Sequence, residues 1–147
     1  MTALNRCTLV LLTALVLVSI QHVAMAQALQ PIHNPKTWAE DFFRRLQKNP
    51  ASAYALLKTA TRHPEKMEAA EGGTTQAIKV FGPMLGAELV EDAAAGKSVK
   101  RLTYIARHQH GPVMYQIFLY APVEGSWEVS GMEITGDAGQ FPFEPAK

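Results

Sequence analysis

The hydrophobic pattern of this chain changes its period once, and this change constrains the fold more than any single motif does. Through residues 38–81, apolar side chains recur at the three-to-four-residue spacing of one helix face. Through residues 87–135 they alternate with polar ones or form short apolar runs, as strands do. Helices followed by strands predict an α+β domain, with the N-terminal helices packed on one face of a four-stranded antiparallel sheet.

Two Asn-Pro pairs mark the expected starts of the first two helices. Asn34 and Asn49 each precede a proline, and an asparagine cap followed by proline at the first helical position is a typical helix start. Trp38, Phe42 and Leu46 then share one face of the first helix. The second helix has an apolar face of its own, made by Ala53, Tyr54, Leu57 and Ala60.

A third helical region contains two adjacent glycines. Pro64 suits a helix start, but Gly72 and Gly73 are expected to break the helix, because glycine is unfavourable in a helix interior. A further helix, capped by Thr74 or Thr75, would follow. Its expected inward residues are Ile78, Phe81 and Leu85.

Four strands are predicted after the change of period. Their strings are AELVEDAAAG, SVKRLTYIARHQ, VMYQIFLYAPV and SWEVSGMEIT. In the second string Leu102, Tyr104 and Ala106 fall on one face, whereas the third string is apolar on both faces, as in a central strand. The alternation of the fourth string shifts phase at Gly131, which predicts a β-bulge. The connections are short and rich in turn residues, so we expect an antiparallel meander.

With its elements in this order, the chain resembles the nuclear transport factor two-like superfamily, also described as cystatin-like α+β cone folds. Four strings carry the resemblance: WAEDFFRRLQKNPASAYALL, FGPMLGAELVED, KRLTYIARHQHGPVMYQIFLY and GSWEVSGMEI. The resemblance implies a cone-like domain in which a curved sheet and the helices enclose an apolar cavity for a small apolar ligand. The expected lining of that cavity is Tyr54, Tyr104, Phe118 and Trp127. Aromatic residues at such spacing are also ordinary core material.

The same resemblance implies that two copies pair by packing their sheets together. The string VMYQIFLY is apolar on both faces and would leave an exposed patch on a monomer. We therefore expect a homodimer through the sheet.

The N-terminus has the layout of a secretory signal peptide. One basic residue, Arg6, precedes an apolar run over residues 9–20, and an Ala-x-Ala pattern ends at Ala26. The run is too short to span a membrane, so we expect cleavage between Ala26 and Gln27, a periplasmic or secreted protein, and no membrane association after cleavage. The predicted organisation is a signal peptide (1–26), a leader (27–37), the α+β domain (38–135) and a C-terminal tail (136–147) whose Phe141 and Phe143 dock on the domain.

Charge and cysteine content argue against several classes of function. The sequence has 14 basic and 13 acidic residues, and removal of Arg6 with the signal peptide leaves the two balanced. A chain without basic excess has no electrostatic footprint for nucleic acid or for an anionic membrane. The one cysteine, Cys7, lies in the predicted signal peptide, so the mature chain is expected to form no disulfide. No cofactor is expected.

Two histidines, His108 and His110, lie two positions apart before Gly111 and Pro112. Residues so spaced on a strand point the same way, and both imidazoles could then reach one metal ion. A zinc site needs three or four protein ligands, however, and the pattern supplies no third one. The turn character of Gly-Pro favours solvent-facing histidines at a hairpin tip instead.

No catalytic residue is predicted. The acid and base of ketosteroid isomerase-like members of the superfamily cannot be matched to residues here, and no serine lies on a nucleophile elbow. Arg101 and Arg107 share a strand face, either as an anion-binding stripe or a partner surface or, as is usual, as a solvated face. The sequence therefore predicts an exported binding or interaction module. The alternative is a small-molecule carrier or enzyme that uses the cone cavity.

Overall fold

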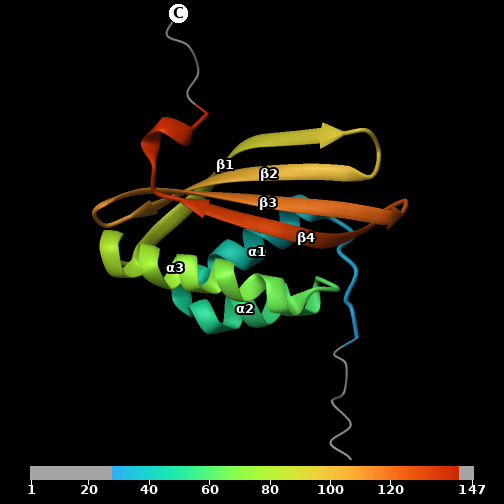
Figure 1. The fold of residues 1–147 in the computed structure, drawn as a ribbon, viewed down its shortest axis with the longest axis horizontal. Helices are drawn as coiled ribbons and strands as arrows, with labels where there is room; N and C mark the ends of the chain where they lie inside the picture. Colours follow the sequence, from blue (N-terminus) through green and yellow to red (C-terminus); the bar gives the residue numbers. More distant parts are fainter. Residues whose placement is uncertain (1–27, 143–147) are drawn as a thin grey trace, which may run out of the picture.

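A computed structural model of the chain describes residues 28–142. Its elements are α1 (Pro35–Lys48), α2 (Pro50–Thr59), η1 (Pro64–Lys66), α3 (Met67–Phe81), β1 (Met84–Ala95), β2 (Val99–His108), β3 (Gly111–Val123), β4 (Ser126–Thr135) and η2 (Ala138–Gln140). Helices α1 to α3 lie on one side of a curved sheet and the turn η2 lies on the other (Figure 1). The predicted α+β architecture is therefore confirmed. The predicted cleavage site at Ala26 and Gln27, Cys7 and Phe143 lie outside the described residues.

The four strands form the predicted antiparallel meander, in the order β1-β2-β3-β4. The bulge expected near Gly131 is confirmed as well. Phe118 of β3 pairs with Gly131 and Leu119 pairs with Val129, so that Ser130 is the extra residue of β4. This bulge explains why apolar side chains keep facing the helices on both sides of the phase shift.

Both Asn-Pro helix starts are confirmed. The Asn34 side chain accepts a hydrogen bond from the Thr37 N–H at 3.1 Å, and the Asn49 side chain accepts one from the Ser52 N–H at 3.3 Å. These bonds satisfy backbone donors that the first helical turn leaves unpaired. The predicted inward faces of α1 and α2 are buried through Phe42, Leu46, Ala53, Tyr54 and Leu57.

Helix α3 runs without interruption through both glycines, so the expected break at Gly72 and Gly73 is wrong. Each glycine costs the helix about 1 kcal/mol relative to alanine, but burial of one helix face outweighs this cost. That face consists of Met67, Ala70, Thr74 and Ala77. The helix ends at Phe81, where Gly82 turns the chain with a φ of +79°. Leu85, expected to pack inward, is an exposed residue of β1.

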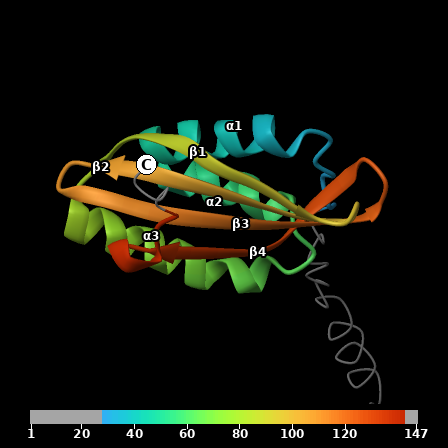
Figure 2. The ribbon, with the colours of Figure 1, turned by 90° about the horizontal axis from the view of Figure 1, so that it is seen from above.

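The helices cover one face of the sheet, which we call the inner face, and we call the opposite face the outer face. Seen from above, α1 lies nearest β1 and α3 lies nearest β4 (Figure 2). Side chains alternate between the two faces along each strand. On β3 the fully buried inner-face residues are Val113, Tyr115, Ile117 and Leu119. Within residues 28–142, no helix has the length and apolar character needed to cross a membrane.

Candidate functional site on the outer face of the sheet

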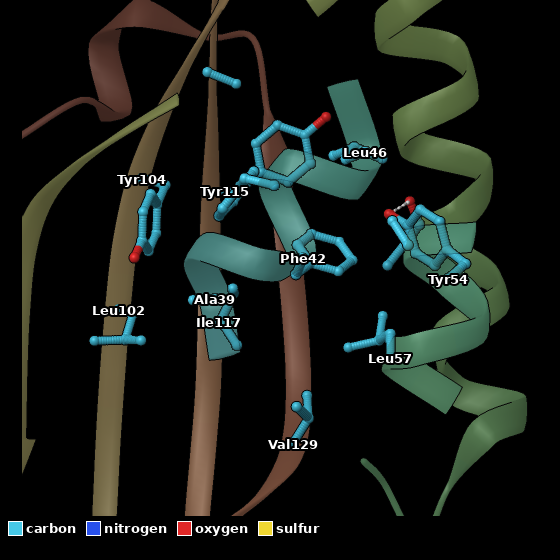
Figure 3. Close-up of a cluster of buried hydrophobic side chains, with 14 of the residues drawn as sticks. Ala39, Phe42, Leu46, Tyr54, Leu57, Leu102, Tyr104, Tyr115, Ile117 and Val129 are labelled. Atoms are coloured by element: carbon cyan, nitrogen blue, oxygen red, sulfur yellow. Dashed lines mark hydrogen bonds between the residues drawn. The ribbon is translucent and has the colours of Figure 1, made fainter. Parts of the chain in front are cut away.

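Aromatic rings fill the space between the helices and the inner face (Figure 3). The ring centroid of Phe43 lies 4.4 Å from that of Tyr104 and 5.4 Å from that of Tyr115. The Phe42 ring lies 5.2 Å from Phe43 and 5.8 Å from Tyr54. These spacings are typical of packed aromatic pairs. Around Tyr54 and Tyr104, where the sequence predicted the lining of a ligand cavity, packed core rings occupy the space.

The tyrosine hydroxyls of the core differ in their hydrogen bonds. The Tyr54 hydroxyl donates to the Ala70 carbonyl at 2.9 Å and lies 2.6 Å from the Thr74 hydroxyl. The Tyr115 hydroxyl faces the same Thr74 without forming a hydrogen bond of normal geometry, and the buried Tyr104 hydroxyl has no partner among residues 28–142. The Tyr104 and Tyr115 hydroxyls point in opposite directions along their strands (Figure 3), so they do not converge on one point.

Burial raises the pKa of Tyr54, Tyr104 and Tyr115, because a phenolate would lose its hydration. For Tyr104, burial and the weaker influence of the negative charges of Glu40 and Asp92 raise the pKa to about 12. Hydroxyls held neutral in this way can form hydrogen bonds but exchange protons poorly near neutral pH. Burial therefore keeps these three hydroxyls protonated near neutral pH.

Phe118 does not face the core with Tyr54 and Tyr104, whereas Trp127 packs against that core. Phe118 pairs with Arg101 and lies on the outer face, away from the helices. Trp127 is half-buried in the edge strand β4, where its backbone exchanges hydrogen bonds of 2.8 and 2.9 Å with Ile32. Three of the four expected lining residues thus belong to the core or pack against it, and Phe118 lies on the opposite face.

His108 is buried, so the expectation of two solvent-facing histidines is wrong for this residue. Its side chain faces inward at the end of β2 with 5% exposure, and its Nδ1 donates to the Gly82 carbonyl at 2.7 Å. The next histidine, His110, is exposed in the turn, and its backbone N–H donates to the Phe81 carbonyl at 2.8 Å. Both bonds fasten the hairpin tip to the end of α3. Within the part of the chain that the structure describes, no three His, Cys, Asp or Glu side chains gather as a metal site would require.

The outer face keeps large apolar side chains at the surface. Val90, Val99 and Tyr120 are 44%, 41% and 42% exposed. Val99 of β2 pairs directly with Tyr120 of β3, and the half-buried Phe118 is the next residue of β3 on that face. We call the surface made by Val99, Phe118 and Tyr120 the open patch.

The charges beside the open patch are neutralised within the chain. The Arg101 guanidinium donates to both carboxylate oxygens of Glu91 at 2.9 and 3.1 Å, and the Thr103 hydroxyl donates to the same carboxylate at 3.0 Å. On the other side, Arg62 donates to Glu128 at 2.7 Å. Arg101 therefore belongs to an ion pair between neighbouring strands, and the patch lies between two paired charges.

The C-terminal turn covers a different part of the outer face. After β4 the chain folds back over the sheet (Figure 1). A pocket of about 320 Å³ lies between the strands and the segment that contains η2. Val90, Ile105 and Pro112 line it from the sheet. Ala138, Phe141 and Pro142 line it from the C-terminal segment. All six side chains are apolar.

Sequence reasoning missed this pocket because its lining comes from distant parts of the chain, which only the returning C-terminal segment brings together. Val90 reaches the pocket because the pairing of β1 with β2 shifts register between Leu89 and Glu91. The adjacent apolar residues Leu89 and Val90 were the one local sign in the sequence that β1 places apolar side chains on both faces of the sheet. The open patch, in contrast, follows from the doubly apolar string of β3.

No protein-family model, no curated protein and no solved structure matches this chain. The resemblance to the nuclear transport factor two-like superfamily therefore stays a prediction from the sequence. The side chains of the outer face carry the functional inference on their own.

Proposed function

We propose that this chain is an exported interaction module that pairs with a second copy of itself through the open patch, and that its role is binding rather than catalysis. The observation that carries the proposal is the cross-strand pair of Val99 and Tyr120, two large apolar side chains that are 41% and 42% exposed. Apolar groups gathered at a surface mark interaction sites, since their burial against a partner is favourable.

The paired charges favour a second copy as the partner. A twofold interface brings the same surface together twice, so an unpaired charge near its centre would face its own kind. Like charges that face each other destabilise a complex. Beside the open patch, Arg101 is already paired with Glu91 and Arg62 with Glu128. Neither ion pair therefore adds an uncompensated charge beside the open patch when two copies meet there.

The size of the sheet sets the expected affinity. Strands of ten residues, such as β2 and β4, placed about 4.8 Å apart give a four-stranded face of roughly 600 Å². A stable complex usually buries about 800 Å² on each partner, and η2 occupies part of this face. We therefore expect a reversible dimer that forms as the concentration rises, and not an obligate one.

Two sequence-based expectations accompany this proposal. The predicted signal peptide would deliver the module to the periplasm or the cell exterior. The superfamily resemblance implies pairing through sheets, which is the geometry proposed here.

A carrier or enzyme that uses the cone interior is the second candidate. It is favoured by the buried hydroxyls of Tyr104 and Tyr115, which lack hydrogen-bond partners among the described residues. Groups of this kind often contact a water molecule or a ligand. A ligand site also needs polar groups that converge, and these two hydroxyls point apart between packed rings (Figure 3). This candidate therefore ranks below the interaction module.

Size-exclusion chromatography with light scattering tests the proposal on two matched variants. Val99→Glu places a carboxylate in the open patch, and twofold pairing introduces it twice. Val80→Glu makes the same change at a valine that is 54% exposed on α3. We expect the mass to rise toward that of a dimer with concentration for the wild type and for Val80→Glu, and to stay monomeric for Val99→Glu. A wild-type monomer at about 1 mM, or a dimer that survives Val99→Glu, contradicts the proposal.

A further inference from the structure

The pocket between η2 and the sheet is separate from both the open patch and the aromatic core. We propose that this pocket binds a small, uncharged, apolar molecule of roughly ten heavy atoms. This inference does not rest on pairing through the open patch, because Val99 and Tyr120 do not line the pocket.

The volume of the pocket favours a small molecule over a segment of another protein. At about 320 Å³ it lies at the lower end of the range of about 300–1,000 Å³ for small-molecule sites. One turn of an α-helix, about 10 Å wide and 5.4 Å long, occupies roughly 400 Å³ and does not fit. A water molecule takes about 30 Å³ in the liquid, so roughly ten heavy atoms fill the space.

The apolar lining of the pocket favours an uncharged ligand. Val90, Ile105 and Pro112 on the sheet side carry no side-chain hydrogen-bonding group, and neither do Ala138, Phe141 and Pro142 on the other side. A charged ligand would lose its hydration there without gaining a partner. An uncharged arene or short alkyl compound loses little on leaving water and gains dispersion contacts on two sides. An uncharged ligand is therefore complementary to the uncharged lining of the pocket.

The C-terminal side of the pocket is fixed by local contacts. Asp137 accepts a hydrogen bond from the Gly139 N–H at 2.9 Å, which holds the turn η2. Gly136 lies so close to the Phe81 ring that a Cβ atom on it would stand 2.7 Å from a ring carbon. The chain is therefore held against Phe81 where it enters the turn. A pocket preformed in this way binds its ligand without a large cost of ordering.

A titration of the labelled protein with naphthalene, followed by methyl NMR, tests the inference. Naphthalene is an uncharged arene of the estimated size, and 1-naphthoate and 1-naphthylmethylammonium are its charged analogues. We expect saturable shifts at the methyl groups of Val90 and Ile105 and none at Val99, with the charged analogues at least about tenfold weaker. The absence of saturable shifts at Val90 and Ile105, or equal affinity for a charged analogue, overturns the inference.

Two matched substitutions locate the binding. Ala138→Phe fills the pocket from the turn, whereas Ala95→Phe makes the same change at an exposed position of β1 outside the pocket. We expect the first variant to lose naphthalene affinity by at least about tenfold and the second to retain it. Binding that survives Ala138→Phe overturns the inference. Binding that appears only after Phe143→Ala also overturns the inference. The occupant of the pocket would then be the chain's own C-terminal residues.

Discussion

The inner and outer faces of the sheet both carry large apolar side chains, but these side chains have different roles. β3 supplies apolar residues to both, yet Tyr115 and Ile117 are fully buried under the helices while Tyr120 stays 42% exposed. Hydrophobic stabilisation grows with the apolar area removed from water. The inner residues therefore hold the fold together, whereas the outer ones contribute less to folding and remain available for a partner. The comparison predicts that mutations on the two faces separate stability from binding.

The largest expected effect contrasts two phenylalanines on opposite sides of the sheet. Phe42→Ala empties a fully buried position of the core and should lower the free energy of unfolding by about 3–5 kcal/mol. Phe118→Ala, at a half-buried outer position, should lower it by about 1 kcal/mol. Urea unfolding of both variants measures the difference. Equal losses would show that the outer face is as much a part of the folding core as the inner face.

An intermediate effect is expected where the chain leaves β4 for the outer face. Gly136→Ala pushes a methyl group into the Phe81 ring and should destabilise the protein by about 1–3 kcal/mol. Gly72→Ala is the matched control, since a Cβ atom at that exposed helical position meets nothing within 4 Å. It should stabilise the protein by about 0.5–1 kcal/mol. Thermal or urea unfolding should thus shift in opposite directions, and shifts of the same sign would refute the packing at Gly136.

The smallest effect concerns the alkaline stability of the inner face. The pKa of Tyr104 rises from the ordinary tyrosine value of 10.0 to about 12 in the fold, chiefly through burial. The stability linked to this group is complete below pH 10 and is lost as the pH rises through about 12, because only the unfolded chain ionises readily in between. Tyr104→Phe should reduce this loss. Urea unfolding across this pH window checks it, and identical pH slopes for wild type and variant would contradict the shift.

Local rules predicted most of the fold. The caps at Asn34 and Asn49, the alternation in β2 and the bulge beside Gly131 depend on neighbours in the sequence, and the structure confirms each of them. The continuous helix through Gly72 could not be predicted in this way. Its stability comes from packing against α2 and the sheet, which includes the bond between the Tyr54 and Thr74 hydroxyls.

The candidate sites also differ in how far neighbouring residues in the sequence could predict them. The open patch could be predicted in part, because the string VMYQIFLY is apolar on both faces and one face must then point outward. The pocket and the buried position of His108 could not, because each depends on a distant segment. The His108 side chain is buried at the end of α3, where it binds the Gly82 carbonyl. The pocket is lined by Phe141, which follows β4.

We expect the open patch to be the surface through which two copies pair. Amide NMR spectra recorded from about 10 µM to about 1 mM protein test it most directly, because a weak dimer forms within this range. We predict concentration-dependent shifts at Val99 and Arg101 of β2 and at Phe118 and Tyr120 of β3, with the amides of α2 and α3 unchanged. Spectra that do not change with concentration, or shifts confined to the helices, would contradict the claim.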